Sequence, residues 1–77
     1  MKLKKFVENF ADQFDETDAS ELNEETKFKE LDEWSSLVAL SVISMVDDEY
    51  DVAIKGDDIR KAETILDLYK IVQAKAE

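Results

Sequence analysis

The side chains that could carry out chemistry are few in this sequence. The chain contains no His and no Cys, which removes the commonest general base, the commonest zinc ligands and every thiol nucleophile. Acidic clusters remain, at 24–25, 47–49 and 57–58, but a small domain offers little concave surface in which burial could raise their pKa. We therefore expect these acids to be solvated surface, and we expect a protein that has no catalytic residues and is not an enzyme.

An acidic stretch that begins at Asp51 can be tested as a calcium-binding loop. Gly56 falls at the sixth position of the EF-hand pattern, where that pattern has glycine. However, Ala53, Lys55 and Ala62 stand where oxygen ligands are required. The pattern fails, and we expect no metal site.

Two adjacent serines are the other candidates. Ser35 and Ser36 come just before a periodic stretch that runs to Tyr50. Serine is a favoured residue at helix starts, so local spacing alone favours a capping role. The apolar stripe that should face the core contains Ala39, Val42, Ile43, Val46 and Tyr50. Leu37 falls opposite this stripe, where a large apolar side chain faces water unless a partner covers it.

Other elements must position these serines. A first amphipathic helix is predicted over residues 2–14, with Asn9 among the residues that face outward. Its apolar stripe contains Leu3, Phe6, Val7, Phe10 and Phe14. A connection of roughly twenty residues then follows, which is unusual in a compact domain. We expect three large apolar side chains, Phe28, Leu31 and Trp34, to anchor it to the core.

The last part of the chain predicts a short helical turn and a final helix. Gly56, the only glycine, should break the chain before the turn. Thr64 and Asp67 are spaced like a capping box at the start of the final helix. The core face of that helix contains Ile65, Leu68, Tyr69 and Val72. The predicted fold is all-α, a single domain over residues 1–77 with three main helices and one short helix.

Charge narrows the range of partners. The chain has 77 residues, of which 20 are Asp or Glu and 10 are Lys or Arg, and its formal net charge is −10. Such an acidic chain repels phosphate backbones, so we expect that it does not bind nucleic acid. We expect its protein partners to be basic. The longest apolar run is far shorter than a bilayer span, so we expect that the chain does not insert into a membrane and that it is cytoplasmic. We also expect a monomer.

The longer context around the serines resembles a known family. The run FKELDEWSSL over residues 28–37 precedes an amphipathic helix that ends VDDEY at 46–50, and KAETI at 61–65 opens the final helix. This order resembles the acyl carrier proteins of fatty-acid and polyketide synthesis and the related aminoacyl and peptidyl carriers. In that family an Asp-Ser-Leu motif begins the second helix. Ser36 and Leu37 match its last two residues, and Ser35 takes the place of the Asp.

The resemblance implies a function and a site. Ser36 would receive 4′-phosphopantetheine from coenzyme A, through a phosphopantetheinyl transferase, and the thiol of this arm would hold acyl groups as thioesters. Acyl-transferring or acyl-activating enzymes would present basic patches to the second helix. The implied docking surface contains Leu37, Leu40, Ser41, Ser44, Asp47 and Asp48.

Two further questions stay open from the sequence. The chain could instead be a small acidic helical adaptor that binds a basic protein and carries no prosthetic group. Cargo is also open, because residues that could line an acyl cavity serve equally well as core packing. These residues are Val46, Ile54, Ile59, Ala62 and Tyr69.

Overall fold

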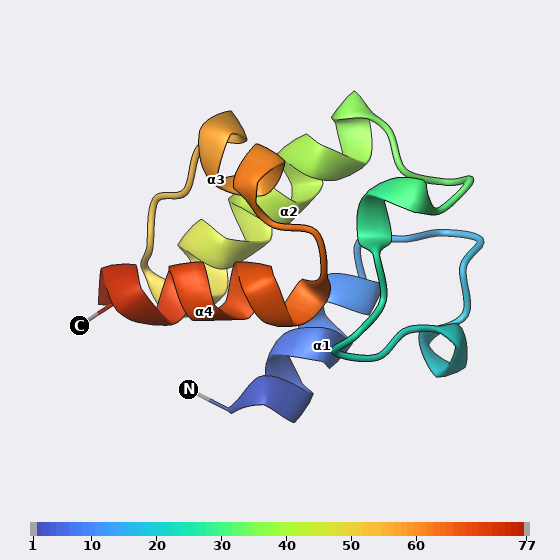
Figure 1. Cartoon of the computed structure of the whole chain (residues 1–77), viewed down its shortest axis with the longest axis horizontal. Helices are drawn as coiled ribbons and strands as arrows, with labels where there is room; N and C mark the ends of the chain where they lie inside the picture. The colour runs from blue at the N-terminus through green and yellow to red at the C-terminus, as the bar shows by residue number, and fades with distance from the viewer. Residues whose placement is uncertain (1, 77) are drawn as a thin grey trace.

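The structure is a computed structural model that describes residues 2–76, and it is all-helical over that range (Figure 1). Its helices are α1 (Leu3–Ala11), α2 (Ser36–Tyr50), α3 (Gly56–Lys61) and α4 (Ile65–Ala76). Two short 3₁₀ turns, η1 (Ala19–Glu21) and η2 (Phe28–Glu30), lie in the connection between α1 and α2. The predicted bundle of three main helices and one short helix is confirmed. Within residues 2–76, no helix combines the length and the apolar character that crossing a membrane requires.

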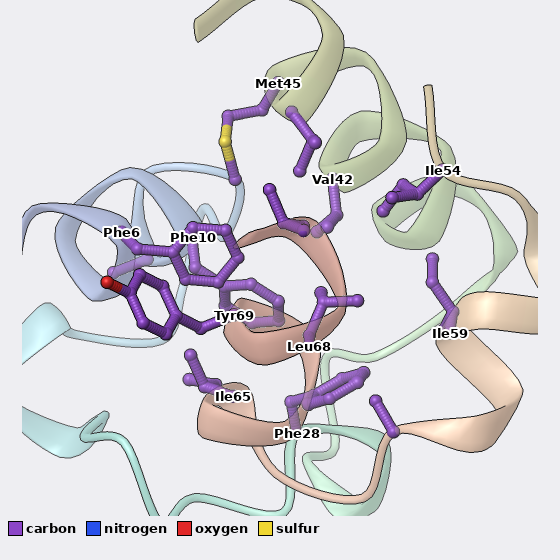
Figure 2. Close-up of a cluster of buried hydrophobic side chains, with 14 of the residues drawn as sticks. Phe6, Phe10, Phe28, Val42, Met45, Ile54, Ile59, Ile65, Leu68 and Tyr69 are labelled. Carbon is purple, nitrogen blue, oxygen red and sulfur yellow. The ribbon is translucent and has the colours of Figure 1, made fainter. Parts of the chain in front are cut away.

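The helices surround one hydrophobic core. Helix α1 packs against α2 and α4, and α3 packs against α4. In Figure 1, α2 runs obliquely above α4, and the long connection after α1 occupies the opposite side from the two chain ends. Figure 2 shows side chains from all four helices and from the connection meeting at the centre. The largest fully buried side chains are Phe6, Phe10, Phe28, Val42, Val46, Ile65, Leu68 and Val72.

The first helix is shorter than the predicted range of residues 2–14. Helix α1 ends at Ala11. Beyond it the backbone tightens, because the amide of Phe14 donates to the carbonyl of Ala11, three residues back, at 3.0 Å. This turn still places Phe14 in the core, where it is 6% exposed. The apolar spacing therefore continues past the end of the helix, which is why the sequence pattern overestimates its length.

Two core contacts differ from the predicted helix faces. Asn9, expected to face outward, is buried, and its side-chain amide donates to the Tyr50 hydroxyl at 3.0 Å. Desolvation by burial raises the pKa of Tyr50 above its ordinary value of 10.0. Met45 is also buried, and it extends from α2 toward the aromatic rings of α1 (Figure 2). Because α1 covers one side of α2, the buried arc is displaced from the predicted stripe, of which only Val42 and Val46 are fully buried.

The long connection is anchored to the core as predicted. Phe28 is fully buried, and the centre of its ring lies 5.2 Å from that of Phe10 and 4.9 Å from that of Trp34. Leu31 and Trp34 are half-buried against the same core. A fourth anchor, Leu22, is 6% exposed. It stands alone in a polar run, where no periodic pattern reveals it.

The start of α4 is held by side chains and by the long connection. The Thr64 hydroxyl accepts from the Asp67 amide at 3.1 Å, and the Asp67 carboxylate accepts from the Thr64 amide at 3.1 Å. These two bonds confirm the predicted capping box. The carbonyl of Glu24 accepts from the Leu66 amide at 2.9 Å, so the connection satisfies a donor that a helix start leaves without an internal partner.

The segment between α2 and α3 turns sharply and then enters the core. Asp51 ends α2 in the left-handed conformation, with φ at 55°, which Asp tolerates better than most residues. Val52 and Ile54 are then buried without forming a strand. Gly56, which was expected to break the chain before the short helix, is itself the first residue of α3, and the non-helical segment comes before it. Glycine can adopt helical backbone at a helix start. Because Gly56 also lies close to the turn after α2, the sequence favoured a break in the chain at this residue.

Truncation of the main anchor should destabilise the fold. Phe28→Ala removes a fully buried ring, and we expect the free energy of unfolding to fall by about 3–5 kcal/mol. Leu37→Ala is a matched control, because Leu37 is 76% exposed and its loss should change stability by less than about 0.5 kcal/mol. Urea unfolding followed by circular dichroism measures both. Equal losses in the two variants would contradict the anchoring of the connection by Phe28.

Candidate functional site

The two adjacent serines at the start of α2 have different environments. Ser35 is the N-cap residue, with extended backbone, and its hydroxyl oxygen accepts from the Val38 amide at 3.3 Å. Ser36 is the first residue of the helix and is exposed. Its hydroxyl has no hydrogen-bond partner among residues 2–76. The capping role expected of this pair therefore belongs to Ser35, and the hydroxyl of Ser36 is open to solvent and to a partner.

The electrostatic environment of Ser36 favours an anion. The amides at a helix N-terminus carry partial positive charge that is directed outward along the helix axis. The first turn of α2 contains no acidic residue, although the chain as a whole is strongly acidic. A negatively charged group on the Ser36 oxygen would thus meet the positive end of the helix dipole without a carboxylate beside it in that turn.

The predicted docking residues all lie exposed along α2. Leu37 and Leu40 are the large apolar residues with the greatest exposure, at 76% and 61%. The polar members of the surface are also exposed, and they are Ser41, Ser44, Asp47 and Asp48. At about 1.5 Å of rise per residue, Asp47 lies about 16 Å from Ser36 along the helix axis. The structure therefore gives α2 an apolar end beside Ser36 and an acidic end about three turns away.

A pocket of about 690 Å³ lies beside Ser36, between the first half of α2, the long connection and α3. Sequence reasoning did not find it, because its walls come from segments that are far apart in the chain. A hydrogen bond of 2.9 Å from the Lys29 ammonium to the Arg60 carbonyl joins the connection to α3 at this point. The residues around the pocket are Lys29, Trp34, Ser35, Ser36, Ala39, Leu40, Ile43, Gly56, Ile59 and Arg60.

The residues proposed to line an acyl cavity are part of the core. All are buried in the same continuous cluster as the aromatic anchors: Val46, Ile54, Ile59, Ala62 and Tyr69. Ile59 alone of these also borders the pocket beside Ser36. Core packing accounts for their positions.

A carboxylate three residues before Ser36 holds the turn that follows α1. Glu33 accepts hydrogen bonds from the amides of Asp15, Glu16 and Thr17 at 2.7–3.1 Å, and from the Thr17 hydroxyl at 2.8 Å. Partial desolvation acts to raise the pKa of Glu33, but these bonds outweigh it and lower the pKa below its ordinary value of 4.5. The bonds tie residues 15–17 to the segment that leads into Ser36. Nothing in the local sequence distinguishes Glu33 from the other acids of the connection.

The acidic clusters form no candidate metal site in the described part of the chain. Within residues 2–76, no group of three or more acidic side chains is placed so that it could hold a metal ion. The EF-hand pattern from Asp51 falls partly on the extended segment and partly on α3, where the ring of ligands that calcium needs does not form.

Comparison with known proteins adds no relative. No protein-family model, curated protein or solved structure matches this chain. The function is therefore inferred from the environment of Ser36 and from the sequence pattern over residues 28–65.

The hydrogen bonds to Glu33 predict a pH dependence. Because its pKa is lowered on folding, the stabilisation is present above about pH 4.5 and is lost as the pH falls through the lower pKa of the folded state. We expect Glu33→Gln to be less stable than the wild type at pH 7, with a difference that shrinks toward pH 3. Urea unfolding across this range measures the difference. Glu30→Gln, in the same connection, is the control, and a loss at pH 7 as large as that of Glu33→Gln would contradict the assignment.

Proposed function

We propose that this chain is an acyl carrier protein whose Ser36 carries a 4′-phosphopantetheine arm. The observation that carries the proposal is the division of roles between the two serines. Ser35 caps α2 with its hydroxyl oxygen, and Ser36 presents an exposed hydroxyl at the first helical position. The resemblance of residues 28–65 to acyl carrier proteins identifies the same serine, independently of this geometry.

The residues around Ser36 fit the group. The phosphodiester of the arm is an anion, and the start of α2 offers it the positive end of the helix dipole with no acid in the first turn. When bound, the arm supplies a thiol that holds acyl groups as thioesters, which accounts for a carrier without Cys. The contribution of the chain is to hold this attachment point on a rigid helix, so that reaction with a docked enzyme becomes effectively intramolecular.

The exposed side of α2 supports the docking of partner enzymes. Leu37 and Leu40 offer an apolar contact next to Ser36. Asp47 and Asp48, at the other end of the helix, would attract basic patches and orient the encounter. The partners proposed are a phosphopantetheinyl transferase and acyl-transferring or acyl-activating enzymes with basic surfaces. The same face would serve an aminoacyl or peptidyl carrier, and a small acidic adaptor without a prosthetic group is the alternative.

Attachment of the arm tests the proposal directly. We expect incubation with coenzyme A and a broad-specificity phosphopantetheinyl transferase to add the mass of one phosphopantetheine to the wild type and to Ser35→Ala. Ser36→Ala should add none, because it lacks the acceptor hydroxyl, and intact-mass spectrometry measures all three. Failure of the wild type with several transferases would favour the adaptor, whereas loss only in Ser35→Ala would assign the arm to the other serine.

Charge reversal tests the docking surface. We expect the double variant Asp47→Lys/Asp48→Lys to slow the transfer of the arm by about tenfold or more at low salt, since steering by charge accelerates association by that order. The difference should shrink at high salt, where the attraction in the wild type is screened. Glu24→Lys/Glu25→Lys changes the net charge equally, but on the long connection, and is the control. Equal slowing in both double variants would show that only net charge matters.

A further inference from the structure

The pocket beside Ser36 has a charge opposite to that of the rest of the chain. Two cationic residues, Lys29 and Arg60, border it, and none of the residues around it is Asp or Glu. This composition stands out in a chain with 20 acidic residues and a net charge of −10. The other residues around the pocket are mostly apolar, including Trp34, Ile43 and Ile59. A ligand that suits this pocket therefore has an anionic group joined to a less polar portion.

The two cations come from different parts of the chain and are held together. The Lys29 ammonium donates to the carbonyl of Arg60 at 2.9 Å. An ammonium has three donors, so this bond leaves two for a ligand. The Arg60 guanidinium forms an ion pair with Asp57 on the same helix, in which both side chains are largely exposed, at 76% and 70%. Exposed pairs of this kind are weak, and the guanidinium has five donors, so Asp57 does not prevent Arg60 from binding an anion.

We infer that Lys29 and Arg60 are positioning residues that bind the phosphodiester on Ser36 and direct the arm along the pocket toward α3. The inference rests on the proposed function, since the anion considered is the one that this function attaches to Ser36. Ser36 borders the same pocket as Lys29 and Arg60, so a phosphate on its oxygen enters the space that the two cations border. The apolar floor, which includes Trp34 and Ile59, then contacts the less polar part of the arm.

This assignment gives the arm a preferred side of the carrier. The docking surface is exposed along α2, and of its residues only Leu40 also borders the pocket, whereas Ile43 and Ile59 border the pocket from α2 and α3. An arm held by Lys29 and Arg60 lies in that pocket when no enzyme is bound. The attraction between charges that are exposed to water is weak and sensitive to salt, so a docked enzyme can still draw the arm out.

The only tryptophan of the chain reports on this pocket. Trp34 borders it, and the chain contains no other Trp. We expect attachment of the arm to shift the Trp34 emission of the wild type, and to give a broad ³¹P resonance, because the phosphodiester moves with the domain. In Lys29→Gln/Arg60→Gln carrying the arm, the emission shift should be lost and the ³¹P line should narrow. The wild-type line should narrow likewise at high salt.

Matched variants separate binding of the phosphodiester from effects on folding. Lys27→Gln/Lys61→Gln removes the same charge from exposed positions that do not border the pocket, and it should behave as the wild type. Lys29 also donates a hydrogen bond to the backbone carbonyl of Arg60, which the double variant removes. The single variant Arg60→Gln keeps this bond and provides a second measurement of the ³¹P line width. Its ³¹P line should narrow partly. Lys29→Arg should retain the broad line.

Intact mass distinguishes the failure of this inference from that of the proposed function. A wild-type chain that accepts no arm overturns both. A chain that accepts the arm, but has the same Trp34 emission with and without it and the same ³¹P line width in all variants, overturns only the assignment of Lys29 and Arg60. Narrowing in Lys27→Gln/Lys61→Gln as large as that in the pocket variant would also overturn it, by showing that net charge alone is responsible.

Discussion

The packing of Phe28 against Phe10 and Trp34 is the contact on which the site depends. A connection as long as that between α1 and α2 has a large conformational entropy, and burial of its own apolar side chains holds it against the helices, together with its hydrogen bonds to α3 and α4. The buried Phe28 ring fixes the middle of the connection. Trp34, held by the same contact, sets the path of the backbone immediately before the cap of α2. The exposed serine at the helix start is therefore in a defined position because the aromatic cluster that precedes it in the chain packs on the core.

Much of the fold could be predicted from the sequence, because its strongest signals are local. The 3.6-residue spacing indicated the helices, the Thr64–Asp67 pair indicated where α4 begins, and large apolar residues in a polar run indicated the anchors. Features that depend on distant segments were not predictable. Asn9 is buried because the Tyr50 hydroxyl lies opposite, and the pocket is bordered by segments as far apart in the chain as Lys29 and Arg60. Neither partner can be inferred from the spacing around the other.

In the candidate site, too, the features set by local sequence were predictable and those set by distant segments were not. That Ser35 or Ser36 would cap a helix was a local inference, but which of the two hydroxyls remains open depends on where the first helical residue falls. The exposure of Leu37 followed from the helical wheel, whereas that of Leu40 was implied only by the resemblance to acyl carrier proteins. The electrostatic environment of Ser36 could not be predicted from the overall composition of the chain. A net charge of −10 describes an acidic protein, whereas the surface next to Ser36 has two cations and an acid-free first turn.

The hydrogen bonds of Glu33 also determine which amino-acid substitutions the turn after α1 tolerates. Its partners in the turn after α1 are backbone amides, together with one hydroxyl. Every residue except proline has such an amide, so the side chains of Asp15 and Glu16 can be exchanged for most others while the attachment persists. The carboxylate at position 33 has no such freedom. Homologous chains that keep this turn should thus differ widely at 15 and 16 but retain an acid at 33, a pattern opposite to that expected if the acids of the turn were themselves a binding surface.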